Sequence, residues 1–127
     1  MARRFERSAI MIALLAMFWV SEAAAHARLI KSAPAADAVL NHSPAAISLW
    51  FNETPEVEFS SIQVLDTSAQ VVFKGELKPT PEPNGLSLQV PRLSAGNYQI
   101  HYRILSVDGH VLEGEFRFRI DASVLDR

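Results

Sequence analysis

Apolar and polar residues alternate with a period of two over several short stretches that follow residue 26. This period places successive side chains on opposite faces of a strand, and one apolar face is typical of half-buried strands. The alternation predicts seven strands, at or near residues 27–31, 47–51, 62–64, 71–73, 86–90, 98–104 and 116–120. Helical periodicity is absent over any long window of the same region.

Residues that favour turns separate the predicted strands. They are Pro34, residues 41–44, Pro55, residues 78–85, residues 94–97 and Asp108–Gly109. Seven short strands in about a hundred residues predict an all-β fold, an immunoglobulin-like Greek-key β-sandwich or barrel. The sequence LSAGNY at 93–98 further predicts a tyrosine corner at the start of the sixth strand, and residues 78–85 are expected to form a mobile loop.

The first 25 residues have the three-part pattern of a secretory signal peptide. Three arginines precede an apolar run at 9–20, and a small-residue site ends at Ala25. Cleavage after Ala25 leaves residues 26–127 as one periplasmic domain with His26 first; cleavage after Ala27 or a nearby small residue is the competing prediction. An uncleaved membrane anchor fits less well, because a spanning helix needs about 20 apolar residues. The mature chain is expected to contain no membrane span.

The composition and charge of the mature chain limit the functions that it can have. The signal contains three of the 12 basic and two of the 14 acidic residues, so the mature chain has a net charge of −3. That charge and the absence of a basic cluster argue against nucleic-acid binding. The chain has no cysteine, and all three methionines lie within the signal. A metal in this domain would therefore be functional rather than structural, and would bind without sulfur ligands.

The four histidines differ in their chemical setting. His101 lies on the polar face of a predicted strand and His42 lies in a turn, so both are expected to be solvated surface residues. After cleavage, His26 offers an α-amine, with a pKa near 7.7–8, and an imidazole that can chelate the same ion. The alternative for His26 is that its position is an accident of processing.

Asp108 and His110 form the second candidate cluster. On an extended backbone their side chains would point the same way, whereas Asp-Gly is also a hairpin-turn signal. Together with His26 they form an N3O set that suits tetragonal Cu(II), with Zn(II) and Ni(II) open from ligand type alone. Glu53, from an acidic segment that is more often a solvated loop, is a lower-ranking fourth metal residue. No nucleophile motif or phosphate-binding glycine loop is present.

Several stretches resemble the CopC-type periplasmic copper-binding proteins, including their small YobA-like members. They are HARL at 26–29, SAPAAD at 32–37, ISLWFNE at 47–53, LSAGNY at 93–98, SVDGH at 106–110, Gly114 and residues 116–118. The N-terminal histidine combined with SVDGH is a fairly specific signature. The resemblance implies an immunoglobulin-like fold with a Cu(II) site formed by His26, Asp108 and His110, and with Glu53 near it.

The same resemblance also implies a role for the protein in copper handling. Family members with two sites hold Cu(I) on methionines, which this mature chain lacks, so we expect one Cu(II) per chain. The predicted function is sequestration or carriage of copper for homeostasis, resistance or delivery, by a monomer, with a CopD-type inner-membrane protein as a partner. Two alternatives compete with this non-enzymatic role. They are a histidine-brace copper monooxygenase and a metal-free immunoglobulin-like interaction module.

Overall fold

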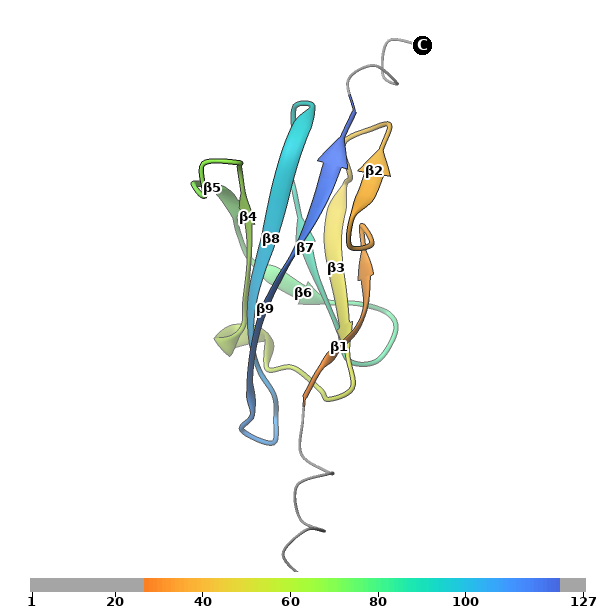
Figure 1. Ribbon diagram of the computed structural model, residues 1–127. Coiled ribbons are helices and arrows are strands. Elements are labelled where there is room, and N and C mark those ends of the chain that lie inside the picture. Colours follow the sequence, from red (N-terminus) through yellow and green to blue (C-terminus); the bar gives the residue numbers. More distant parts are fainter. Residues whose placement is uncertain (1–26, 122–127) are drawn as a thin grey trace, which may run out of the picture.

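The structure, a computed structural model, describes residues 27–121 as two β-sheets packed face to face (Figure 1). In chain order the elements are β1 (Leu29–Ala33), β2 (Ala38–Leu40), β3 (Ala46–Phe51), the short 3-10 helix η1 (Val57–Phe59), β4 (Ser61–Leu65), β5 (Val71–Lys74), β6 (Leu77–Pro79), β7 (Gly85–Gln89), β8 (Gly96–Leu105) and β9 (Val111–Ile120). One sheet has the order β1-β3-β7-β6 and the other has the order β2-β9-β8-β4-β5. The predicted immunoglobulin-like sandwich is confirmed.

The core lies between the two sheets and consists of the apolar faces that the alternation predicted. In β3, for example, Ile47, Leu49 and Phe51 are buried while Ser48 and Trp50 are not. The largest fully buried side chains are Ile47, Leu49, Ile62, Leu86, Leu88, Ile100, Ile120 and Val64. They come from strands of both sheets, so the sandwich has one continuous hydrophobic core.

All seven predicted strands are present, but the predicted number is wrong, because the described residues form nine. The two further strands, β2 and β6, have three residues each and are too short to show alternation. Residues 78 and 79 were expected in a loop but belong to β6. Pro79 is tolerated there because β6 is an edge strand, where a missing amide donor breaks no interior ladder.

The last strand is also longer than predicted. β9 begins at Val111, whereas the pattern predicted a strand at residues 116–120. Gly114 interrupts the alternation of apolar and polar residues, but it does not end the strand. Gly114 pairs with Tyr102 across the β8–β9 ladder, and any side chain at position 114 would collide with the Tyr102 ring. The glycine is therefore required by close packing within the sandwich rather than by a turn.

The predicted tyrosine corner is confirmed. The Tyr98 hydroxyl donates a hydrogen bond to the Ser94 carbonyl at 2.6 Å, and the Tyr98 ring stacks on Phe118 at 5.5 Å between centroids. The corner fixes the entry into β8, the strand that leads to the turn described below. Within residues 27–121 no helix has the length and apolar character needed to cross a membrane.

Candidate metal centre

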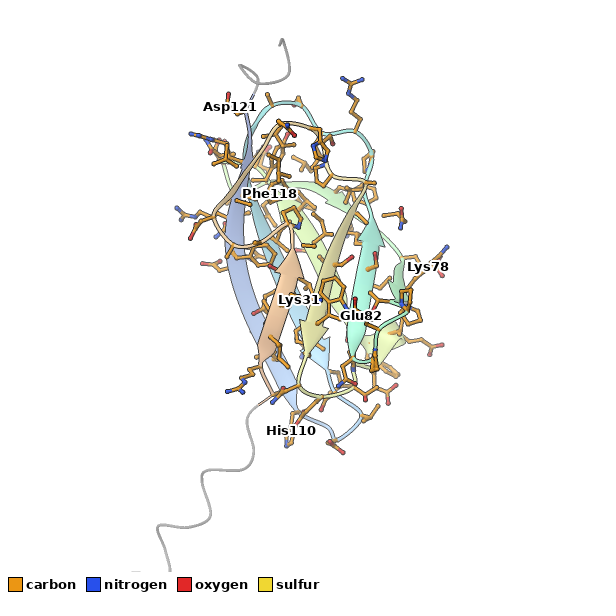
Figure 2. The ribbon with its side chains drawn as sticks, turned by 90° about the vertical axis from the view of Figure 1, so that its right-hand side faces the viewer. Lys31, Lys78, Glu82, His110, Phe118 and Asp121 are labelled. Carbon is orange, nitrogen blue, oxygen red and sulfur yellow. The ribbon has the colours of Figure 1, made fainter. Side chains whose placement is uncertain are left out.

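Three segments meet at one end of the sandwich, at the bottom of Figure 1. They are the start of β1, the segment that follows β3, and the turn between β8 and β9. Figure 2 places His110 at this end, close to where the chain enters β1, and Asp121 at the opposite end. Glu53 belongs to the second segment, and Asp108 and His110 belong to the turn.

Backbone hydrogen bonds join the second and third segments. The Glu56 amide donates to the Leu105 carbonyl at 2.7 Å, and the Val107 amide donates to the Thr54 carbonyl at 2.9 Å. Between these two bonds, Pro55 and Ser106 form an isolated antiparallel bridge. Residues 54–56 thus extend the sheet beside the end of β8, which brings Glu53 next to the β8–β9 turn.

The turn itself is tight. The Gly109 amide donates to the Ser106 carbonyl at 2.9 Å, and the Ser106 amide donates to the His110 carbonyl at 2.8 Å. Gly109 has φ +85°, a left-handed value that favours glycine. The sequence left an extended backbone and an Asp-Gly hairpin turn both open for Asp108 and His110, and the structure has the turn. Asp108 is exposed at the tip of this turn.

Glu53 and His110 are in direct contact. Nδ1 of His110 lies 3.1 Å from both Oε1 and Oε2 of Glu53. The two side chains are 43% and 19% exposed for His110 and Glu53, respectively. Because a carboxylate only accepts, Nδ1 donates its proton to Glu53, and Nε2 of the same ring remains available as a metal ligand.

Electrostatics at Glu53 agree with this geometry. The hydrogen bond from His110 lowers the pKa of the Glu53 carboxyl below its ordinary 4.5. Partial burial acts in the opposite direction, while a hydrogen bond from Ser106 and the charge of His110 add to the lowering. Glu53 is therefore a carboxylate at neutral pH, which is the form that orients an imidazole at a metal site.

The start of the described chain is held at the same place. The Arg28 amide donates to Oδ1 of Asn52 at 2.7 Å, and the Asn52 amide donates to the Arg28 carbonyl at 3.2 Å. Asn52 directly precedes Glu53, so this pair of bonds fixes the chain entry beside the Glu53–His110 contact. His26, the remaining predicted ligand, lies outside the described residues.

The structure thus brings together three of the four predicted metal residues at one end, with Glu53 and His110 in contact and Asp108 in the same turn as His110. Within residues 27–121, no three histidine or acidic side chains cluster closely enough to hold an ion by themselves. Sequence reasoning gave no role to Asn52 or Ser106. A polar side chain directly beside a predicted ligand was the signal available for Asn52.

The other two histidines lie elsewhere, as predicted. His101 is on the outer face of the five-stranded sheet, with Nε2 2.9 Å from Oε2 of Glu115. His42 is exposed in the turn after β2, with Nδ1 2.7 Å from Oδ1 of Asn41. Since Leu40 of β2 pairs with Ile120 at the far end of β9, His42 lies at the end away from His110.

The two-sheet fold, with a histidine–carboxylate pair at the end where the chain enters, places the chain among small β-sandwich proteins with a candidate metal site. The CopC domain profile matches residues 29–121, and the chain belongs to the CopC family. It is 32% identical over 99 residues to protein YobA of Escherichia coli K12, an alignment that covers 76% of this chain and 79% of YobA.

Solved structures agree with this assignment. CopC from Methylosinus trichosporium OB3b superposes with a TM-score of 0.71 at 35% identity, covering 76% of this chain and 94% of that one. PcoC from Escherichia coli, described as a methionine-rich copper resistance protein, superposes with a TM-score of 0.62 at 28% identity. That match covers 76% of this chain and 100% of PcoC. At these identities, both matches support family membership as well as the fold.

Proposed function

We propose that this protein is a periplasmic Cu(II)-binding protein that sequesters or carries copper for homeostasis, resistance or delivery to a membrane partner. Its ligands would be the α-amine and imidazole of His26, the Asp108 carboxylate and Nε2 of His110, which hold one ion per chain. The observation that favours this function most is the Glu53–His110 contact, which leaves Nε2 free at the exposed end of the sandwich.

Glu53 would then act on the metal through His110. Both of its oxygens are 3.1 Å from Nδ1, so the carboxylate is engaged with the ring. A metal-bound histidine usually donates its second ring proton to a carboxylate or carbonyl, which fixes the tautomer and raises the basicity of the ligand nitrogen. Glu53 has the position and the ionisation state for that role.

The position of the chain entry supports the part assigned to His26. Arg28 is fixed to Asn52, beside Glu53, and two residues span at most about 7 Å. A mature N-terminus at His26 could therefore reach the His110 end without displacing β1. Deprotonation of the amine then allows both nitrogens of one residue to bind the same ion.

Ligand chemistry favours Cu(II) over Cu(I). Soft thioether and thiolate groups select Cu(I), whereas imidazole, amine and carboxylate suit tetragonal Cu(II). This chain has no cysteine, and it has no methionine after Met17. PcoC is by contrast described as methionine-rich. We infer that this protein binds Cu(II) only, as a monomer, and that it exchanges copper with a CopD-type membrane protein.

The two competing functions make different demands on the site. A copper monooxygenase needs an open coordination position for oxygen, whereas Asp108 in the same turn as His110 would occupy one. A metal-free interaction module has no use for the Glu53–His110 pair. We therefore propose a binding protein rather than an enzyme, and reductant-dependent oxidation of a polysaccharide would contradict this.

The test is a competition titration of natively processed protein against a chromogenic Cu(II) chelator, for wild type, His110→Ala and His101→Ala. The matched control is His101, which also contacts a glutamate, Glu115, but lies on the outer sheet face. We expect His110→Ala to lose at least about tenfold in affinity, the order expected when a group at a metal site is removed, and His101→Ala to match wild type. Equal affinities for all three proteins would contradict the proposed site.

A further inference from the structure

Ser106 is unusual among the described residues, because it is the one polar residue that is buried, with 4% of its surface exposed. A buried hydroxyl destabilises a fold unless it finds hydrogen-bond partners. The partners of Ser106 are parts of the candidate site. Its Oγ accepts the amide proton of His110 at 3.1 Å, and its own amide donates to the His110 carbonyl at 2.8 Å.

One residue thus holds both backbone groups of His110. The hydroxyl proton of Ser106 is not used in either of these bonds, since Oγ acts as the acceptor toward the His110 amide. A serine hydroxyl can accept and donate at the same time. Glu53 lies next to this arrangement, because its Oε1 and Oε2 are both 3.1 Å from Nδ1 of the same His110.

We propose that Ser106 is a positioning residue of the copper site, whose hydroxyl and amide fix the His110 backbone so that the His110 ring meets Glu53. The proposal rests on the proposed function, and it extends that function to a residue that does not touch the metal. Ser106 fixes the backbone from which the His110 ring extends, and Glu53 fixes the orientation of that ring.

The location of Ser106 explains why a serine is suited to this task. It forms the isolated bridge with Pro55, between the two backbone bonds that join residues 54–56 to the end of β8. Glu53 and His110 approach each other from the two sides of this junction. The Ser106 hydroxyl therefore meets the His110 amide where the two segments join.

Ser60 provides a matched control. Its hydroxyl also joins the same two segments, since it donates to the Glu56 carbonyl at 2.7 Å and accepts the Leu105 amide proton at 3.2 Å. Unlike Ser106, it contacts neither Glu53 nor His110 in any hydrogen bond of the structure. Removal of the Ser60 hydroxyl therefore tests the structural effect of losing such a bridge without touching the site.

The first experiment measures Cu(II) affinity and the Cu(II) electron paramagnetic resonance spectrum of Ser106→Ala and Ser60→Ala, both natively processed. We expect Ser106→Ala to lose about 10- to 100-fold in affinity, the usual range for groups that orient a metal ligand, with altered hyperfine splitting. Ser60→Ala should keep both wild-type values. The pair Ser106→Thr and Ser106→Val, equal in shape but differing in the hydroxyl, keeps the test valid if alanine unfolds the turn: threonine should retain affinity and valine should lose it.

The second experiment needs no copper, so it separates this proposal from the proposed function. Nitrogen-15 chemical shifts of the His110 ring in the metal-free protein report which ring nitrogen is protonated. We expect a single Nδ1–H tautomer in wild type and Ser60→Ala, and a mixture in Ser106→Ala. If wild type fails to bind Cu(II) but the tautomers differ as expected, the proposed function falls and the positioning role stands. A single unchanged tautomer in Ser106→Ala, or affinity within twofold of wild type, would overturn the positioning role.

Discussion

Nδ1 of His110 lies 3.1 Å from both carboxylate oxygens of Glu53, although 57 residues separate the two in sequence. The contact forms because residues 54–56 pair with the end of β8 and the tight turn after β8 returns His110 to the same place. It decides which ring nitrogen faces solvent. A copper ion at this end would therefore meet a ring of fixed orientation and tautomer.

Replacing Glu53 tests that orientation. We expect Glu53→Gln to weaken Cu(II) binding about 10- to 100-fold, because a neutral amide holds the imidazole less well than a carboxylate. Glu58→Gln, in the exposed part of η1, is the control and should bind as wild type does. Competition titration measures both. Wild-type affinity in Glu53→Gln would show that the contact does not matter to the metal.

The same carboxylate predicts a pH dependence of the metal-free protein. The hydrogen bond from His110 lowers the pKa of Glu53 in the folded state below 4.5. Stabilisation by the carboxylate is therefore fully present above pH 4.5, and it is lost as the pH falls through the lower folded-state pKa. In chemical unfolding between pH 7 and pH 3, the stability gap between wild type and Glu53→Gln should narrow below pH 4.5. A stability difference between the two proteins that does not change with pH would contradict the lowered pKa of Glu53.

Asn52 is expected to affect both stability and copper binding, because it holds the backbone of Arg28 where the chain enters β1. Asn52→Ala removes the acceptor of the Arg28 amide, so we expect loss of about 1 kcal/mol of stability and weaker Cu(II) binding. Amide hydrogen exchange at Arg28 should become faster in the metal-free protein. Asn52→Asp keeps an acceptor oxygen and should retain slow exchange. If Asn52→Ala exchanged and bound copper as wild type does, the chain entry would not be part of the site.

The tyrosine corner provides a prediction about stability alone. Tyr98→Phe removes the hydrogen bond to the Ser94 carbonyl and should cost about 0.5–1.5 kcal/mol in urea unfolding. Gly96, at the start of β8, pairs with Ile120 at the end of the sandwich away from His110. Cu(II) affinity should therefore be unchanged. A parallel loss of affinity would show that the site is coupled to the whole fold.

Much of the fold could be predicted from the sequence, because alternation over strands such as residues 47–51 and 98–104 directly reports one buried face. The edge strands β2 and β6 could not, since three residues contain too little alternation and Pro79 resembles a loop residue. The first half of β9 could not be predicted either, because Gly114 interrupts the alternation there. A glycine is needed at position 114 because of the Tyr102 ring on the neighbouring strand, which no local pattern shows.

The candidate site was predictable as a set of ligand types but not as an arrangement. Asp108 and His110 were recognised from their motif, but the sequence left open whether their backbone is extended or forms the Asp-Gly turn that the structure has. The contact of Glu53 with His110 depends on pairing between segments about fifty residues apart, and the role of Asn52 depends on its bonds to Arg28, 24 residues away. No local pattern reports such pairing, so these relationships required the three-dimensional structure.

The most direct test of the central claim concerns His26 as the first residue. It compares the Cu(II) electron paramagnetic resonance spectrum of natively processed protein, at one equivalent of copper, with that of a variant carrying one extra residue before His26. We predict a tetragonal, nitrogen-rich spectrum that is lost or altered in the extended variant, because the amine and the imidazole no longer belong to one residue. Identical spectra from the two proteins would contradict an N-terminal copper site.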